Sequence, residues 1–238
     1  MDVRGERECK SCGTRWSYFE TGSVECPECG SMRSVGVGER SQHTDGNATL
    51  DLSDAQRAAA DGDLRGALDP AVDACRDYCQ SRGFVSGGDL LDLDDTYLAA
   101  QELRRAGVLL GDALRIGDEE ERYVLALLNG AANGDRPSPG AVPESMRAVR
   151  GLGYAAAVET YRSDVRSFCD GEIPEPERGL LERLREHGKR VKALDGEVEP
   201  EDADRLVAAV RAIGDSLRGD DAGVERARSH LDQLEELV

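Results

Sequence analysis

The sequence CKSCG at residues 9–13 and the sequence CPECG at residues 26–30 determine how the N-terminal part of the chain folds. Two residues between cysteines let one tight turn offer both sulfurs to one metal, and Zn²⁺ takes four thiolates tetrahedrally at about 2.3 Å. The glycine after each second cysteine can adopt a positive φ, which turns backbone N–H groups toward the sulfurs. The spacing predicts one zinc ion, held by Cys9, Cys12, Cys26 and Cys29.

The predicted site is closed. Four thiolates fill the coordination sphere, and no histidine or carboxylate at this spacing leaves a position open for water. We therefore expect a structural zinc ion rather than a catalytic one. So small a module cannot bury enough surface to fold alone, so the metal should supply most of its stability.

The residues between the cysteine pairs predict a short hairpin. Residues 14–20 are aromatic and β-prone, residues 21–23 form a turn, and residues 24–25 lead back to the second pair. The expected zinc ribbon covers residues 1–37.

This stretch resembles the zinc ribbon of archaeal transcription factor B and related RNA-polymerase-associated ribbons. The resemblance covers about residues 7–37 and depends on Cys9, Cys12, Gly13, Cys26, Cys29 and Gly30. It implies a small three-stranded, metal-bound module that docks on polymerase or nucleic acid. The cyclin-like repeats of a full initiation factor do not follow it. The whole arrangement is similar to an uncharacterised haloarchaeal protein family in which such a ribbon precedes a helical domain.

A recognition surface on the ribbon is expected at Lys10, Arg15, Trp16, Tyr18 and Arg33. The basic residues can contact an anionic partner, and the aromatic ones can stack on bases. The same arginines and lysine can instead offset the formal charge of the metal site, and at least one aromatic ring is expected to pack over it. The expected partner is a protein, such as RNA polymerase or other transcription machinery, or a nucleic acid.

The composition changes after the ribbon. Residues 38–52 are polar and glycine-bearing, without an apolar period, and predict a flexible linker. Residues 53–238 then predict an all-α domain of about six or seven helices, beginning at a capping box formed by Ser53 and Gln56. The expected fold is mainly α, with a small β ribbon joined by a linker to this multi-helix domain.

Apolar stripes carry the helix predictions. One stripe runs at steps of four, three, four and three through Tyr154, Val158, Tyr161, Val165 and Phe168. A boundary near residues 171–176 separates it from residues 176–238, where three further stripes predict three antiparallel helices.

The formal charge is −18, and the chain has only three lysines. An acidic, lysine-poor surface resembles proteins of halophilic archaea, whose surfaces stay hydrated in concentrated salt. Net charge concerns solubility and association rather than fold. No stretch is apolar enough to span a membrane, and the N-terminus has no signal peptide, so we expect a cytoplasmic protein.

Other candidate sites have plainer explanations. Cys75 and Cys79 lie at i and i+4, where they could share a metal with Cys169, but buried thiols in a reduced protein are favoured. An acidic helix start explains residues 89–95, and the three histidines are dispersed.

No nucleotide-binding or nucleophile-elbow motif is present. The sequence therefore favours a non-enzymatic zinc-binding protein. Two alternatives stay open: a helical enzyme with its site at residues 89–95 or between Tyr154 and Tyr161, and a helical scaffold that forms homo-oligomers.

Overall fold

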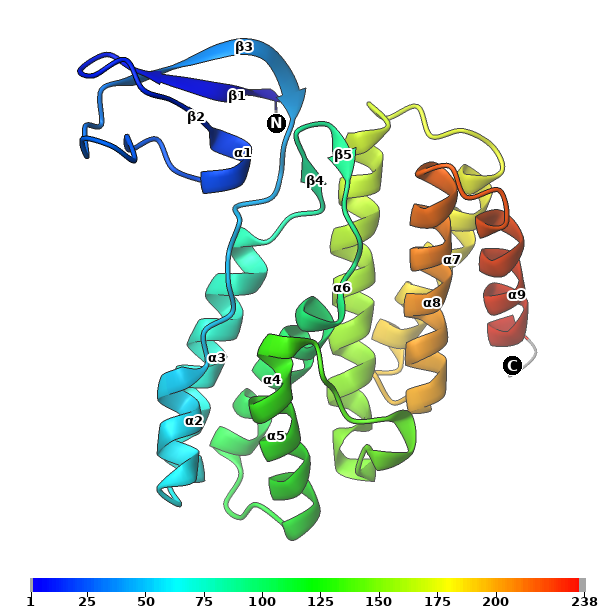
Figure 1. The fold of residues 1–238 in the computed structure, drawn as a ribbon. Helices are drawn as coiled ribbons and strands as arrows, with labels where there is room; N and C mark the ends of the chain where they lie inside the picture. The colour runs from blue at the N-terminus through cyan, green and yellow to red at the C-terminus, as the bar shows by residue number, and fades with distance from the viewer. Residues whose placement is uncertain (1, 236–238) are drawn as a thin grey trace.

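The computed structural model describes residues 2–235. An N-terminal antiparallel sheet is followed by helices that occupy most of the remaining chain (Figure 1). This arrangement confirms the predicted mainly α fold with a small β module in front.

The sheet has three strands in the order β2-β1-β3. These are β1 (Asp2–Cys9), β2 (Arg15–Ser17) and β3 (Ser34–Gln42), and both pairings are antiparallel. The three-stranded module that the resemblance implies is therefore present. From here on, the ribbon means residues 2–42.

The hairpin predicted between the cysteine pairs is wrong. After β2 the chain turns into the short helix α1 (Tyr18–Thr21), because the Ser17 hydroxyl accepts a hydrogen bond from the Glu20 N–H and Gly22 ends the helix in the left-handed conformation. Capping thus overrides the β-propensity of the aromatic run. The third strand comes only after the second cysteine pair.

The segment expected as a linker, residues 38–52, has more structure than predicted. Its first five residues belong to β3, which pairs with β1. Further on, the Thr44 and Asp45 N–H groups donate to the Val85 carbonyl at 2.8 and 3.2 Å, and Leu50 and Leu52 are buried. The backbone of this segment therefore hydrogen-bonds to the chain beyond residue 53. Whether the chain divides into separately folding domains stays a prediction.

Eight α-helices follow within the described residues. They are α2 (Ser53–Ala60), α3 (Leu64–Ser81), α4 (Asp95–Asp112), α5 (Asp118–Gly130), α6 (Arg147–Phe168), α7 (Glu177–Ala193), α8 (Pro200–Leu217) and α9 (Gly223–Glu235). The capping box predicted at Ser53 does not form: Leu52 precedes the helix without a side-chain cap, and the Asp51 carboxylate accepts from the Ser53 N–H at 2.9 Å.

A two-stranded hairpin that the sequence did not predict separates α3 from α4. Its strands β4 (Val85–Ser86) and β5 (Asp89–Leu90) are joined through Gly87 and Gly88, which both have positive φ. Strands this short give no measurable alternation in sequence. The hairpin lies between the ribbon and α6 (Figure 1).

Helix α6 runs through the middle of the helical part (Figure 1) and packs against α4, α7 and α8. Its predicted stripe is confirmed: Tyr154, Val158, Tyr161 and Val165 are buried, and Phe168 is half-buried at the end. The three helices predicted after residue 176 are α7, α8 and α9, and they share one apolar core with α6. We refer to residues 53–235 as the helical part.

Candidate metal centre

The four cysteine sulfurs of the ribbon gather at one point. All four Sγ atoms lie within 4.8 Å of one another. The Cys9 and Cys29 sulfurs are 3.6 Å apart, as are those of Cys12 and Cys26. Four ligands at about 2.3 Å from a zinc ion at the centre of a tetrahedron are roughly 3.8 Å apart, so the cluster has the size that a Zn–S₄ site requires.

Two similar turns build the cluster. The Gly13 N–H donates to the Cys9 carbonyl at 3.0 Å, and the Gly30 N–H donates to the Cys26 carbonyl at 2.9 Å. Both glycines have positive φ, 79° and 67°, as the two CxxCG sequences predict. A side chain at either position would strain the turn that brings its two sulfurs together.

Local hydrogen bonds favour the thiolate form of the first pair. The Cys12 N–H and the Ser11 N–H lower the pKa of Cys9 to about 6, although burial acts in the opposite direction. The Thr14 hydroxyl lowers the pKa of Cys12. Because the thiolate is the form that binds metal, these bonds help prepare the site for a cation.

Trp16 forms the floor of the site. Only 7% of its surface is exposed, and it shares a small buried cluster with Cys9 and Cys26. Its indole Nε1 donates to the Ser23 carbonyl at 3.0 Å. Trp16 packs against these cysteines because the ribbon has few other apolar side chains with which to cover them.

Two of the other candidate recognition residues share one carboxylate partner. Lys10 and Arg15 both pair with Glu8 at 2.8 Å. Tyr18 is half-buried, with its ring 5.8 Å from the ring of His43. Arg33 is exposed.

Exposed apolar residues beside Arg33 were missed in the sequence. Met32 is 64% exposed, Val35 is 39% exposed and Val24 is 36% exposed. The Ser34 hydroxyl donates to the Val24 carbonyl at 2.6 Å, which holds Val24 next to the start of β3. We call Val24, Met32, Arg33 and Val35 the Met32 face. Sequence alone could not separate these residues from a ribbon core.

The ribbon meets the helical part at a seam made by Phe19, His43 and Gly87. The His43 ring lies 4.7 Å from the Phe19 ring, and its Nδ1 accepts from the Gly87 N–H at 3.4 Å. A Cβ placed on Gly87 would lie 3.0 Å from Phe19 Cδ2. His43, which lies within the expected linker segment, is thus a buried contact residue.

The remaining cysteines do not belong to a second cluster of three or more metal-binding side chains within residues 2–235. Cys75 is fully buried in the apolar core, and burial raises its pKa and that of Cys79. Among residues 2–235, the ribbon is the one place where three or more metal-binding side chains converge in a cluster that includes cysteine. The interpretation of Cys75 as a small buried hydrophobe is confirmed.

Arginines account for most of the acidic cluster at residues 89–95. Asp92 pairs with Arg218, Asp94 pairs with Arg82, and Asp95 pairs with both Arg136 and Arg211. Asp94 also caps α4 by accepting from the Tyr97 N–H at 2.7 Å. These carboxylates are paired with arginines around α4. They therefore have little free negative charge with which to bind a cation.

A buried ion pair lies beside Tyr154. Glu102 and Arg150 are both fully buried, and Arg150 Nε donates to Glu102 Oε1 at 2.7 Å. Tyr123 and Tyr154 also donate to Glu102, while Arg150 Nη2 donates to the Pro137 carbonyl at 2.7 Å. Burial and then Glu102 raise the pKa of both tyrosines, which stay protonated donors. This polar network joins α4, α5 and α6, and its groups bond to one another.

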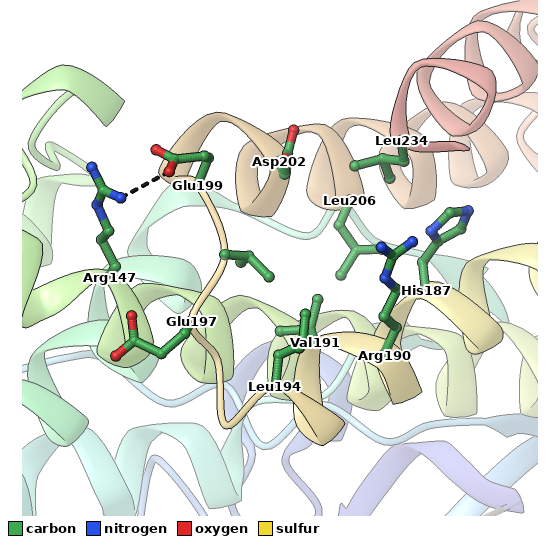
Figure 2. A pocket seen from close by; sticks show the side chains of 11 residues that line it. Arg147, His187, Arg190, Val191, Leu194, Glu197, Glu199, Asp202, Leu206 and Leu234 are labelled. Carbon is green, nitrogen blue, oxygen red and sulfur yellow. Dashed lines mark hydrogen bonds and ion pairs between the residues drawn. The ribbon is translucent and has the colours of Figure 1, made fainter. Parts of the chain in front are cut away.

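A pocket of about 280 Å³ lies between α7 and α8, with Leu234 of α9 at one side (Figure 2). Val191, Leu194 and Leu206 point into it, while charged residues stand around the rim. Arg147 is already paired with Glu199 at 2.8 Å. The rim carries two arginines, three carboxylates and His187, and they surround an apolar floor rather than converging on one point (Figure 2).

The fold and the site define a protein with a four-cysteine ribbon in front of a bundle of helices. The chain belongs to the family of unknown function DUF7117, whose model matches residues 1–231. The family thus spans the ribbon and the helical part together. No curated protein and no solved structure matches the chain. Among the described residues, no helix combines the length and the apolar character needed to cross a bilayer.

Proposed function

We propose that Cys9, Cys12, Cys26 and Cys29 hold one structural Zn²⁺ ion and that the ribbon is a non-enzymatic recognition module for a protein of the transcription machinery. The observation that carries this proposal is the convergence of four sulfurs within 4.8 Å. A site of four thiolates suits zinc, and it leaves no coordination position for a substrate or a water molecule.

The Met32 face supports a protein as the partner. It combines three exposed apolar side chains with one exposed arginine. Exposed methionine and arginine are enriched in protein interfaces, whereas a nucleic-acid site needs several free cations. Two of the expected cations, Lys10 and Arg15, are already engaged by Glu8. The resemblance to polymerase-associated ribbons makes RNA polymerase the first partner to test.

The metal is tested by counting zinc atoms in Cys26→Ser. The full chain should contain one zinc atom for each molecule, and the variant should lose it together with the ordered ribbon, because three thiolates bind the ion far more weakly. Cys169→Ser is the matched control, since that half-buried cysteine lies outside the cluster. Unchanged zinc content in Cys26→Ser would refute the metal assignment.

The partner is tested with Met32→Glu. Leu114→Glu is the matched control, because Leu114 is 99% exposed and belongs to the helical part. Binding to purified RNA polymerase should fall at least tenfold for Met32→Glu and stay unchanged for the control. Binding to duplex DNA that survives in Met32→Glu and is lost in Arg33→Gln would replace the protein partner with nucleic acid.

A further inference from the structure

A second depression, of about 490 Å³, lies on the helical part and has the opposite charge balance from the pocket in Figure 2. It is lined by residues of α4 and α6, with Arg76 of α3 beside them. Three arginines and one carboxylate, Asp112, contribute to its wall. In a chain of net charge −18, such a concentration of positive charge is unexpected.

Two of these arginines lack the carboxylate partner that most arginines of the helical part have. Within the described residues, neither Arg104 nor Arg105 forms an ion pair, although 26 such pairs are present. Arg104 Nη2 donates to the neutral Gln101 side chain at 3.0 Å. The Arg105 Nε atom is buried and has no hydrogen-bond partner among residues 2–235. A buried donor without an acceptor is costly, so this site favours an incoming anion.

The electrostatics around Arg105 agree with this geometry. Burial, followed by the neighbouring charge of Arg104, lowers the pKa of Arg105. An anion placed beside the two guanidinium groups would relieve this repulsion. Arginine suits this role because its planar donors bind carboxylate and phosphate oxygens in pairs.

Apolar surface lies beside the two arginines. Val108 is 52% exposed and Leu109 is 46% exposed, and both line the depression together with Val149 and Leu152 of α6. The volume falls in the range of small-molecule sites, which are about 300–1,000 Å³. A ligand seated there would meet charge at one end and apolar side chains at the other.

We propose that this depression binds a small organic anion with an apolar body. Its carboxylate or phosphate head lies on Arg104 and Arg105, and its apolar body covers Val108, Leu109 and Leu152. The site is independent of the ribbon and of its metal.

Calorimetric titration of the zinc-loaded full chain with octanoate tests the proposal. Octanoate should bind at one site, while acetate and 1-octanol, which carry only the charge or only the apolar chain, should each bind at least tenfold more weakly. Octyl phosphate is titrated in parallel, and tighter binding by either anion identifies the preferred head group. Equal binding of 1-octanol and octanoate would overturn the proposal.

Variants locate the site. Arg105→Gln should weaken octanoate binding by about tenfold, because it removes a charge-assisted hydrogen bond. Val108→Glu changes an exposed residue, so it should leave the fold intact and yet repel the anion by at least as much. Arg166→Gln removes an exposed charge elsewhere on α6 and is the matched control. Octanoate binding that persists in both lining variants would refute the site, as would an acidic peptide that binds there when octanoate does not.

Discussion

The ribbon and the helical part hold their folds by different means. The buried cluster of the ribbon consists of Cys9, Trp16 and Cys26 alone. The helical part has a continuous apolar core that reaches Leu234 and also takes in Leu50 and Leu52, which precede α2. Burial of apolar surface can stabilise the second region but is far too small in the first, where the proposed zinc ion would supply most of the stability. The two regions should therefore fail under different treatments.

Chelation of the metal should have the largest effect and should affect one region only. A structural zinc ion stabilises its module by about 10–16 kcal/mol, so its removal should unfold the ribbon. Trp16, the single tryptophan, reports this directly: its emission should shift to the red as it becomes exposed. The helical circular dichroism signal should stay nearly constant. Simultaneous loss of both signals would show that the two regions are one cooperative unit.

Breaking the buried ion pair should have the next largest effect, in the other region. Arg150→Met leaves the Glu102 carboxylate buried without its cation, which costs about 3–5 kcal/mol. Urea unfolding followed by helical circular dichroism measures this loss. In zinc-loaded protein, the native emission of Trp16 should not change. A loss below about 1 kcal/mol would mean that water reaches Glu102 in the folded protein.

The seam should respond to pH. Burial lowers the pKa of His43 below its usual value of about 6.5, while nearby Asp45 acts in the opposite direction. The unfolded chain therefore takes up a proton before the folded chain does, so stability is fully present above about pH 6.5 and declines as the pH falls below it.

The variant His43→Gln isolates this contribution. Its free energy of unfolding should fall less between pH 7.5 and pH 5.5 than that of the parent chain, although its stability at pH 7.5 should be lower. His187 and His230 also have pKa values lowered by burial, and they give the same background in both proteins. Parallel pH profiles would exclude a role for His43.

An exposed ion pair should have the smallest effect. Arg228 pairs with Glu225 on α9 at 2.7 Å, and both side chains are largely exposed. Arg228→Gln should change the urea midpoint by an amount equivalent to no more than about 0.5 kcal/mol. Compared with Arg150→Met, this variant contrasts an exposed ion pair with a buried one of similar length.

The sequence predicted the parts of the molecule that are specified locally. The spacing of Cys9, Cys12, Cys26 and Cys29 determines two turns, and the stripe on α6 is a repeat within one helix. The eight-residue strand that ends at Cys9 was missed, because its partner β3 lies beyond the second turn and strand pairing is a long-range property.

Contacts between segments that are distant along the chain could not be predicted from the sequence. Glu102 and Arg150 are 48 residues apart, and nothing in their neighbourhood distinguishes them from exposed charges. Likewise, the polar residues of the expected linker resemble solvated chain until their partners are known. The unpaired arginines of the anion site can be recognised only after every other ion pair has been placed.

Asp164 gives the connection between the two regions a geometric consequence. Its Oδ2 accepts from the Thr44 hydroxyl at 2.7 Å and from the Phe84 N–H at 2.6 Å, so the chain leaving the ribbon is bonded to α6 near the C-terminal end of that helix. The ribbon thus lies beside one end of the long helix α6 (Figure 1). These bonds limit rotation of the ribbon relative to the helical part. A partner bound at the Met32 face would therefore have a defined orientation relative to the helices.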